Sequence, residues 1–289
     1  MRKRIPLSLR AVILLVPFML AFSAQEDCDN CIAVYGDSQV GHETHELVVA
    51  SIMGFSPVAV FHTGDMVEDG LDEGLWETFK GITSTLRDNA EFYPAFGNHE
   101  QHSEQFFANF PYLDGQHWYL RQFYGLTFIV LDSTSEIGPG SQQRDWLESE
   151  LERAKSDDEP VVVFLHYPLF NIGSHASEAS RMRPLLAPLF EKYGVVAVFS
   201  GHDHNYQRFV YHKINYFVNG RGGGRLYERT TTDPANKKFI KEYGFCTISI
   251  KGYELIVRAY DQDGNLLDEA SVSLTGEPMN ADSHVTVAQ

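Results

Sequence analysis

The sequence predicts an α/β fold built on a largely parallel sheet whose two faces are covered. Two observations indicate this class. Short β-branched or aromatic runs alternate with stretches of helical apolar spacing between residues 32 and 199, and metal-competent polar residues follow most of those runs. This alternation is typical of parallel sheets, which build their sites at the carboxyl ends of strands. At 289 residues and 43% hydrophobic content, the chain can bury a substantial core.

Residues 1–24 have the pattern of a secretory signal. Four basic residues accompany an apolar run at 11–22, and the small residues Ser23 and Ala24 follow. The run is shorter than the ~18 residues that a membrane span requires, so a cleaved signal is expected, with an uncleaved anchor as the alternative. We therefore expect a single domain at 25–276, a polar tail at 277–289, and a secreted or periplasmic protein without stable membrane association after cleavage.

The charge balance restricts the partners. Without residues 1–24 the chain has 19 basic and 39 acidic residues, a formal charge of −20. Such a surface repels nucleic acid and anionic membranes. A small phosphate substrate stays compatible, because charges beyond a Debye length of ~8 Å are largely screened.

The three cysteines are Cys28, Cys31 and Cys246. In an exported protein Cys28 and Cys31 can close a small disulfide, or either can pair with Cys246, with one thiol left over. A redox or zinc role for the Cys-x-x-Cys pair is disfavoured, because no helix follows it and no second ligand pair has matching spacing.

The first half of the chain is predicted to repeat a strand, a turn and a helix. Apolar runs predict strands at 32–35, 58–62 and 92–95, and helical spacing predicts helices at 43–55, 71–86 and 104–110. Residues 118–124 and 127–131 read as a hairpin around Gly125-Leu126.

The second half begins in the same way and then changes. A helix at 142–155, a strand at 161–165, a helix at 180–193 and a strand at 195–199 continue the alternation. Beyond Tyr206, antiparallel strands are expected at 210–218, 244–250, 253–260 and 266–274, with Lys251-Gly252 and Asp263-Gly264 as turns.

Six residues capable of binding metals stand at or just beyond the ends of these strands. They supply carboxylate oxygen, amide oxygen and imidazole nitrogen, a mixture that suits two divalent first-row ions rather than calcium. Asp65 can bridge ions ~3.5–4 Å apart, and two histidines separated by one residue point the same way on an extended segment. The six candidate ligands are Asp37, Asp65, Asn98, His166, His202 and His204.

The charge of such a site suggests a substrate. Two divalent ions and two aspartates leave a net charge of about +2, which attracts a phosphate, and the ions would lower the pKa of a bound water and generate an attacking hydroxide. His99, adjacent to Asn98, is placed to assist the leaving alcohol as an acid.

Five motifs resemble the calcineurin-like metallophosphoesterases over roughly residues 32–260. The resemblance implies a four-layer α/β/β/α sandwich, with metal site one formed by Asp37, Asp65 and His204 and metal site two by Asp65, Asn98, His166 and His202. His99 would orient the substrate or donate a proton. The motifs are Gly36-Asp37, Gly64-Asp65, Gly97-Asn98-His99-Glu100, His166 and Gly201-His202-Asp203-His204.

Within this family the chain is most similar to purple acid phosphatases, which implies that His175 lies near the phosphate and that the metals are divalent or mixed-valence Mn, Fe or Zn. Two positions depart from that pattern. Glu68 replaces a tyrosine, so the tyrosinate-to-iron colour is expected to be absent, and Gln39 replaces a histidine at site one. Asp69 stands where protein serine/threonine phosphatases have an arginine.

The expected function is that of an exported phosphomonoesterase acting on small phosphate esters. A phosphodiesterase built on the same site and a secreted, non-catalytic binding domain stabilised by metals are the alternatives. The natural substrate, the metal pair and the oligomeric state are left open.

Several further residues carry weaker signals. The segment from Gly220 to Arg225 reads either as an anion-binding nest with two cationic arms or as a flexible connection. Surface or structural roles are expected for His42, His45, His62, His102 and His117.

Overall fold

The computed structural model describes residues 30–275. The expected signal at 1–24, the tail at 277–289 and Cys28 lie outside the described residues. Within residues 30–275, none of the helices combines the length and apolarity needed to cross a membrane.

One sheet has six strands in the order β13-β12-β11-β1-β2-β3. The pairs β1–β2 and β2–β3 are parallel, and the other three are antiparallel. Strands β1 to β3 are almost fully buried. The strands of this sheet are β1 (Ile32–Tyr35), β2 (Ala59–His62), β3 (Glu91–Pro94), β11 (Gly244–Lys251), β12 (Glu254–Asp261) and β13 (Leu266–Ser273).

The second sheet has seven strands in the order β10-β8-β9-β7-β6-β5-β4. Its centre, β9-β7-β6-β5, is parallel, whereas β4, β8 and β10 pair antiparallel with their neighbours. The strands are β4 (Tyr119–Phe123), β5 (Leu126–Val130), β6 (Val161–Phe164), β7 (Ala197–Ser200), β8 (Tyr206–Tyr211), β9 (Ile214–Asn219) and β10 (Asn236–Ile240).

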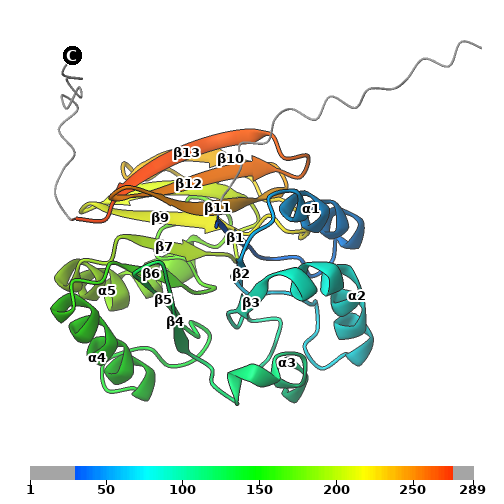
Figure 1. The fold of residues 1–289 in the computed structure, drawn as a ribbon, viewed down its shortest axis with the longest axis horizontal. Coiled ribbons are helices and arrows are strands. Elements are labelled where there is room, and N and C mark those ends of the chain that lie inside the picture. Colours follow the sequence, from blue (N-terminus) through cyan, green and yellow to red (C-terminus); the bar gives the residue numbers. More distant parts are fainter. Residues whose placement is uncertain (1–29, 276–289) are drawn as a thin grey trace, which may run out of the picture.

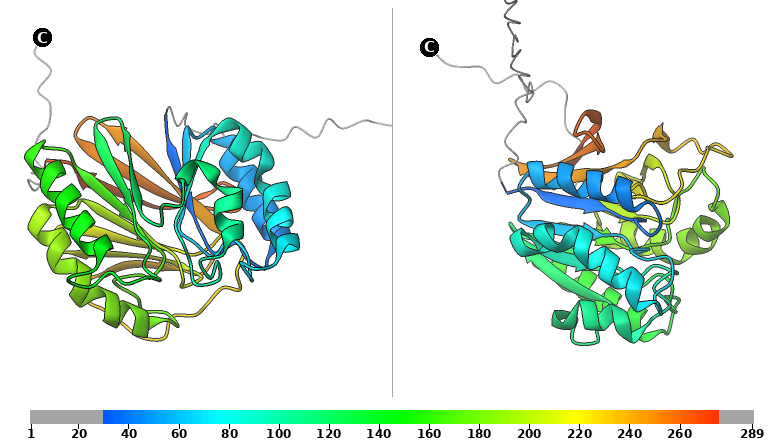
Figure 2. Two further views of the ribbon diagram at one scale, coloured as in Figure 1. Left: turned by 90° about the horizontal axis from the view of Figure 1, so that it is seen from below. Right: turned by 90° about the vertical axis from the view of Figure 1, so that its right-hand side faces the viewer.

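The two sheets pack face to face, and helices cover their outer faces, so that the layers run α/β/β/α (Figure 1 and Figure 2). This confirms the sandwich expected from the family resemblance. The alternation pattern predicts a single, largely parallel sheet with both faces covered by helices. This prediction is wrong, because the structure has two sheets and each has helices on one face only. The helices are α1 (His42–Gly54), α2 (Glu73–Asn89) and α3 (Glu104–Asn109), followed by a short 3₁₀ turn at Pro111–Leu113, on one side, and α4 (Gln142–Ser156) and α5 (Ala176–Tyr193) on the other.

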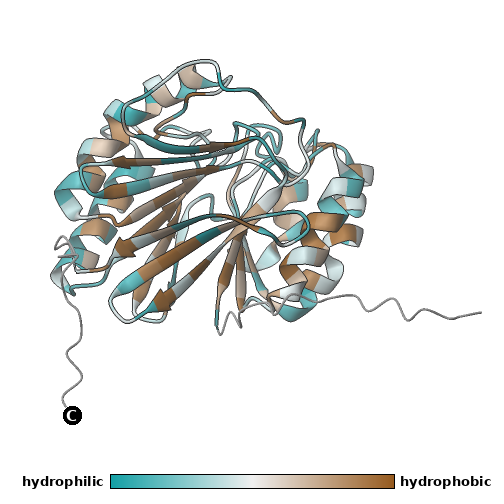
Figure 3. Cartoon of the chain, turned by 90° about the horizontal axis from the view of Figure 1, so that it is seen from above, coloured by the Kyte–Doolittle hydropathy of each residue, from teal (hydrophilic) through white to brown (hydrophobic). Residues whose placement is uncertain are grey.

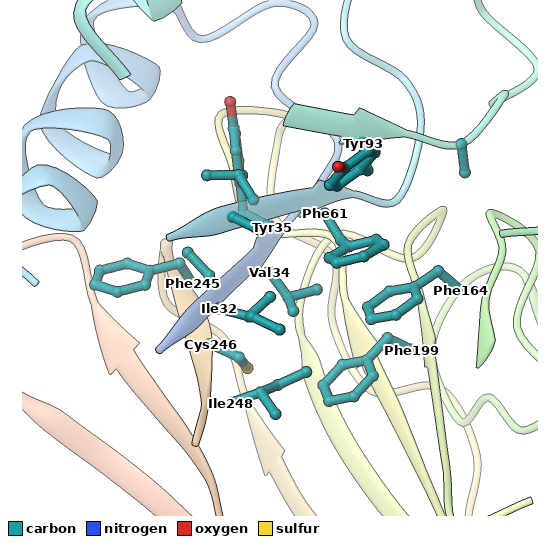
Figure 4. Close-up of a cluster of buried hydrophobic side chains, with 14 of the residues drawn as sticks. Ile32, Val34, Tyr35, Phe61, Tyr93, Phe164, Phe199, Phe245, Cys246 and Ile248 are labelled. Carbon is teal, nitrogen blue, oxygen red and sulfur yellow. The ribbon is translucent and has the colours of Figure 1, made fainter. Parts of the chain in front are cut away.

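Aromatic rings fill the space between the sheets. Phe61 of β2 stacks on Phe164 of β6 with ring centroids 4.2 Å apart, and Phe199 and Phe217 continue the row at 5.3 and 4.7 Å. Figure 4 shows Phe61, Phe164 and Phe199 facing one another from the two sheets. Such buried stacked pairs add to the free energy gained by removing apolar surface from water. Figure 3 shows hydrophobic residues, in brown, along many of the strands, and a mixture of hydrophobic and hydrophilic residues along the helices.

The helices begin and end where the sequence provides caps. The Asp72 carboxylate accepts hydrogen bonds from the backbone N–H groups of Gly74 and Leu75 at the start of α2, and Ser141 caps α4 through Arg144 N–H. Helix α5 ends at Gly194, whose φ of +76° is the left-handed conformation that glycine adopts without strain.

Three elements differ from the sequence expectations. The single strand expected at 210–218 is a hairpin, β8–β9, which turns at His212 and Lys213 with φ of +46° and +70°. Strand β10 was not predicted, because it begins with the polar run Asn236–Lys238 and lies partly exposed at a sheet edge. Helix α5 begins at Ala176 rather than at 180, which places His175 at its amino end.

The described cysteines, Cys31 and Cys246, are both buried and are not joined to each other. The expected alternative of a Cys31–Cys246 disulfide is therefore wrong. Cys31 donates a hydrogen bond to the Phe55 carbonyl, and Cys246 lies in β11 opposite Val34 of β1.

Candidate metal centre and active site

The candidate ligands reach one region from both sheets. Strands β1, β2 and β3 of the six-stranded sheet lead into Asp37, Asp65 and Asn98, and β6 and β7 of the seven-stranded sheet lead into His166 and the His202–His204 turn. Backbone hydrogen bonds connect the loops, including Asp37 N–H to the Gly64 carbonyl at 3.0 Å. The carboxyl ends of parallel strands therefore form the site, as the sequence predicts.

Three of the candidate ligand residues have left-handed backbone conformations. The φ angles are +59° at Asp37, +55° at Asp65 and +69° at His202. A residue other than glycine adopts this conformation at a cost in free energy, and such residues concentrate at functional sites. The loops therefore hold these side chains in orientations that ordinary turns disfavour.

One group of ligands converges on the His166 ring. Its Nε2 atom lies 3.2 Å from Asp65 Oδ2, 3.1 Å from Asn98 Oδ1 and 3.2 Å from His202 Nδ1. Metal–ligand bonds of ~2.0–2.2 Å at tetrahedral or octahedral angles separate neighbouring ligand atoms by roughly 2.9–3.4 Å. These spacings match a coordination shell, and the residues are those expected for metal site two.

Asp37 and His204 form a second group. His204 Nε2 lies 3.4 Å from Asp37 Oδ1 and 3.4 Å from Gln39 Nε2. Asp37 Oδ2 and Gln39 Oε1 are buried without a hydrogen-bond partner in the described part of the chain. Unsatisfied buried oxygens are costly, so their presence fits a cation at this position. Gln39 thus lies beside Asp37 and His204, at the position where the related enzymes are expected to have a histidine ligand.

Neighbouring carbonyls set the tautomers of two histidines. His166 Nδ1 donates a hydrogen bond to the Thr63 carbonyl at 2.9 Å, and His204 Nδ1 donates to the Arg225 carbonyl at 2.9 Å. With Nδ1 protonated in each neutral ring, the Nε2 lone pair faces the cluster. This arrangement is typical of histidine ligands to metals.

Without a metal ion, the charges of the site favour a second proton on the His166 ring, which a bound cation would displace from Nε2. Burial alone would raise the pKa of Asp65, but the nearby His166 ring holds it well below its usual range. Burial opposes a charge on His166, yet the Asp65 carboxylate raises its pKa to about 9. Burial, together with His166, lowers the pKa of His202 to about 2, so the His202 ring is neutral and its nitrogen lone pair is available.

His99 lies at the edge of the same cluster. Its Nδ1 donates to the Glu68 carbonyl at 2.7 Å, and its Nε2 lies 3.9 Å from Asp65 Oδ2, with 30% of the side chain exposed. Burial lowers the pKa of His99, but Asp65 and Glu68 outweigh this effect and raise it. The Glu68 carboxylate lies 3.7 Å from His99 Nδ1, so this residue contacts the candidate acid.

His175 packs against the candidate ligand His202. Its ring centroid lies 4.3 Å from that of His202, and its backbone N–H donates to Asp203 Oδ2 at 3.0 Å. Asp203 is fully buried and also accepts hydrogen bonds from the amides of Asn171 and Asn205. The structure therefore places His175 beside the candidate ligand His202, and its expected position near the phosphate stays a prediction.

Sequence reasoning missed several residues of the site. Tyr227 stacks on His204 with centroids 4.4 Å apart and lies 5.2 Å from the His175 ring, yet the surrounding sequence resembles an ordinary loop. Asp203 was noted only as part of a motif. Its position between two candidate ligands was the available signal.

The glycine-rich segment is neither a cationic nest nor a flexible connection. Arg221 is fully buried and donates to the carbonyls of Phe245 and Tyr260. The N–H groups of Gly222 and Gly224 donate to the carbonyls of Gly36 and Asp37 at 2.7 Å. This segment supports the first ligand loop instead of presenting two arms to an anion.

The histidines expected to be structural or on the surface fall into two groups. His45 is buried and hydrogen-bonded to the Tyr35 hydroxyl, and His62 is buried beside Ser38, as expected. His102 and His117 instead meet at Asp132.

A cavity of about 870 Å³, lined by Arg87 and Arg121 among others, lies at the start of β3 and includes no candidate ligand.

Comparison with known families agrees with this geometry. The model of the calcineurin-like phosphoesterase family matches residues 32–206, which is more than half of the chain. The chain belongs to the calcineurin-like phosphoesterase family. The family assignment confirms the resemblance, and at this site the group of Asp65, His166 and His202 could hold a metal ion.

Among relatives, the chain is 30% identical over 165 residues to a probable purple acid phosphatase 20 of Arabidopsis thaliana, covering 50% of this chain and 39% of that protein. It also resembles the structure of purple acid phosphatase PPD1 from yellow lupin, with a TM-score of 0.73 and 17% identity over 84% of this chain and 53% of that one. The structure of GAP50, the anchor in the inner membrane complex of Plasmodium, is also similar, with a TM-score of 0.70 and 17% identity. The match covers 84% of this chain and 88% of that one. The two structural likenesses concern the fold alone. The chain spans about two fifths of the length of the Arabidopsis relative.

Proposed function

We propose that this protein hydrolyses small phosphate monoesters at a centre of two metal ions. The proposal rests chiefly on the convergence of Asp65, Asn98 and His202 on His166 Nε2 at 3.1–3.2 Å. A site that gathers one carboxylate, one amide oxygen and two imidazoles is typical of hard to borderline divalent ions. The match to the family and to a purple acid phosphatase supports the same reaction class.

When bound, two such ions supply Lewis-acid chemistry and a nucleophile at neutral pH. The role of the chain is to hold and orient them. Asp37, His204 and Gln39 form one side of the site, and Asn98, His166 and His202 form the other. Asp65 lies within 3.2 Å of His166, and its carboxylate would help to hold both ions.

His99 is the proposed general acid. The hydrogen bond from Nδ1 to the Glu68 carbonyl fixes the ring, so that Nε2 is the atom left to interact with substrate. Protonated at Nε2, the ring can donate to the oxygen of the leaving alcohol. The partial exposure of the side chain allows that contact.

His175 and the surrounding aromatic rings are proposed to bind the ester. His175 contacts the His202 ring, Tyr167 lies edge-on to the same ring at 4.6 Å, and Tyr227 covers His204. These rings restrict water around the histidines and offer apolar surface to the organic part of a substrate.

Export and metal identity are part of the proposal. The basic and apolar pattern of residues 1–24 supports a secreted or periplasmic location. The mixed oxygen and nitrogen donors support Mn, Fe or Zn.

The test uses the metal-loaded protein with p-nitrophenyl phosphate and bis(p-nitrophenyl) phosphate. Asn98→Ala and His202→Ala should reduce monoester turnover to the background rate, whereas His212→Gln, a change at an exposed histidine, should leave it unchanged. Turnover of the diester alone would establish a phosphodiesterase instead. A folded, loaded wild type that is inert towards both esters, and towards a panel of natural phosphate esters, would favour a binding domain.

A further inference from the structure

A second group of potential ligands lies outside the centre described above. His102 Nε2 is 2.8 Å and His117 Nδ1 is 3.2 Å from Asp132 Oδ2. The three ligand atoms all lie within 4.8 Å of one another. They come from three segments: the loop after β3, the turn before β4 and the carboxyl end of β5.

Phe96 orients the two imidazoles. The His117 ring stacks on the Phe96 ring at 4.8 Å and 27°, and the His102 ring lies against it at 5.0 Å. Phe96 is itself buried and stacked on Phe106 at 3.7 Å. His102 also has a φ of +50°, a conformation that non-glycine residues seldom adopt. The two rings are therefore held in place before any ligand binds.

The carboxylate is crowded by donors. Asp132 is fully buried, and its Oδ2 atom is approached by His102, His117 and the Ser135 hydroxyl, the last at 2.6 Å. The Thr134 hydroxyl lies 3.0 Å from His102 Nε2. Three donors exceed the two lone pairs of one carboxylate oxygen. A cation between the two nitrogen atoms and this oxygen would take the place of the imidazole protons and accept a lone pair from each of the three atoms, and the Ser135 hydroxyl would remain a donor to Oδ2.

The spacing and the chemical type of the three candidate ligand atoms fit a first-row transition-metal ion. Separations of 2.8 and 3.2 Å lie close to the roughly 2.9–3.4 Å between neighbouring ligands in a first-row coordination shell. Two imidazoles and one carboxylate favour a divalent transition metal over calcium or magnesium. About a third of each histidine side chain is exposed, so water can complete the shell.

We propose that His102, His117 and Asp132 bind a single divalent transition-metal ion, such as Zn²⁺, in addition to the ions of the catalytic centre. This ion would connect the loop that carries Asn98 and His99 to the loop after β5. Ser133 in the second loop accepts hydrogen bonds from the backbone N–H groups of His166 and Tyr167. The ion therefore braces the two loops that border the catalytic centre without contacting the substrate.

The experiment counts metal ions. The full chain is stripped with a chelator, re-equilibrated with Zn²⁺, and analysed by inductively coupled plasma mass spectrometry. The double variant His102→Gln/His117→Gln should hold about one equivalent less than the wild type. His212→Gln, which removes an exposed histidine paired with Glu191, is the matched control and should hold the same amount as the wild type. Equal metal content in the wild type and the double variant would overturn the proposal.

A second measurement avoids any misfolding of the double variant. Diethyl pyrocarbonate modification of the wild type is mapped by mass spectrometry with and without Zn²⁺. Protection of His102 and His117, but not His212, is expected, and it should persist in Asp65→Asn, which disables the catalytic centre. Loss of protection in Asp65→Asn, or no protection in the wild type, would mean that the cluster is only a hydrogen-bonded contact. Because neither readout uses turnover, failure of the proposed phosphatase activity would be recognised separately.

Discussion

The Glu100 carboxylate lies directly against the backbone of Asp65 and accepts a hydrogen bond from its N–H at 2.9 Å. The same side chain accepts from Met66 N–H at 2.7 Å and from Gly97 N–H at 2.6 Å. Glu100 is fully buried and therefore joins the loops after β2 and β3. The proposed bridging ligand and the Asn98 loop thus depend on one side chain that is not itself among the candidate ligands.

Replacing Glu100 with glutamine should impair both stability and activity. The amide has one acceptor oxygen, and its NH₂ group would face backbone donors, so at least one buried N–H loses its partner at a cost of about 1–3 kcal/mol. Misplacement of Asp65 should reduce metal affinity or activity about 10- to 100-fold. Urea unfolding of the metal-free protein and metal titration measure the two effects. Unchanged values in both would show that Glu100 does not position the loops.

Replacing Gln39 with histidine should strengthen the site near Asp37. Residue 39 is buried and its amide nitrogen lies 3.4 Å from His204 Nε2, so an imidazole there reaches the same ligand group. Metal affinity should rise about tenfold relative to the wild type, whereas Gln39→Ala should lower it. Competition titrations with a metal-binding dye test this order. Equal affinities for all three proteins would exclude residue 39 from the site.

Arg221→Ala should destabilise the fold, in contrast to Arg225→Ala. The buried Arg221 guanidinium donates hydrogen bonds to the carbonyls of Phe245 and Tyr260 and to the Asn219 amide oxygen, and its removal takes these hydrogen bonds away and opens a cavity. The free energy of unfolding should fall by about 3 kcal/mol or more. Arg225 is exposed, so its replacement should change stability by no more than about 0.5 kcal/mol. Similar unfolding curves for both variants would contradict this assignment.

The Cys246 thiol should resist alkylation in the native protein. Burial raises its pKa to about 12, so the reactive thiolate is scarce at pH 8. Because the folded pKa is higher than that of a free thiol, the thiolate appears in the native state only as the pH approaches 12. Iodoacetamide labelling at pH 8, followed by peptide mapping, should modify Cys246 only after unfolding in guanidinium chloride. Equal labelling rates in native and unfolded protein would refute the prediction.

The ligand positions could be predicted from the sequence because each follows an apolar strand, and a short metal-competent motif after such a strand is a local signal. The arrangement of the two sheets could not be derived in this way, since the alternation pattern contains no information on which strands pair. The hairpin between β8 and β9 was missed because His212 and Lys213 adopt left-handed conformations without the glycine or asparagine that usually marks such a turn.

The side-chain partners were the least predictable part of the site. Arg221 lies in a sequence that reads as an exposed glycine-rich loop, and only the structure shows its buried carbonyl partners. His102 and His117 are 15 residues apart in a region without periodicity. Asp132, which ends a strand as the other ligands do, was the one signal that could have directed attention to them.

The candidate ligands are divided between the two sheets, with Asp37, Asp65 and Asn98 on one and the three histidines on the other. Among the residues that the structure describes, no strand pairing joins the two sheets. Ions at this position would consequently act as a crosslink between the halves of the sandwich, and their binding free energy would add to that of folding. The melting temperature of this protein is therefore expected to depend on the free metal concentration, so that heat tolerance and catalytic competence vary together.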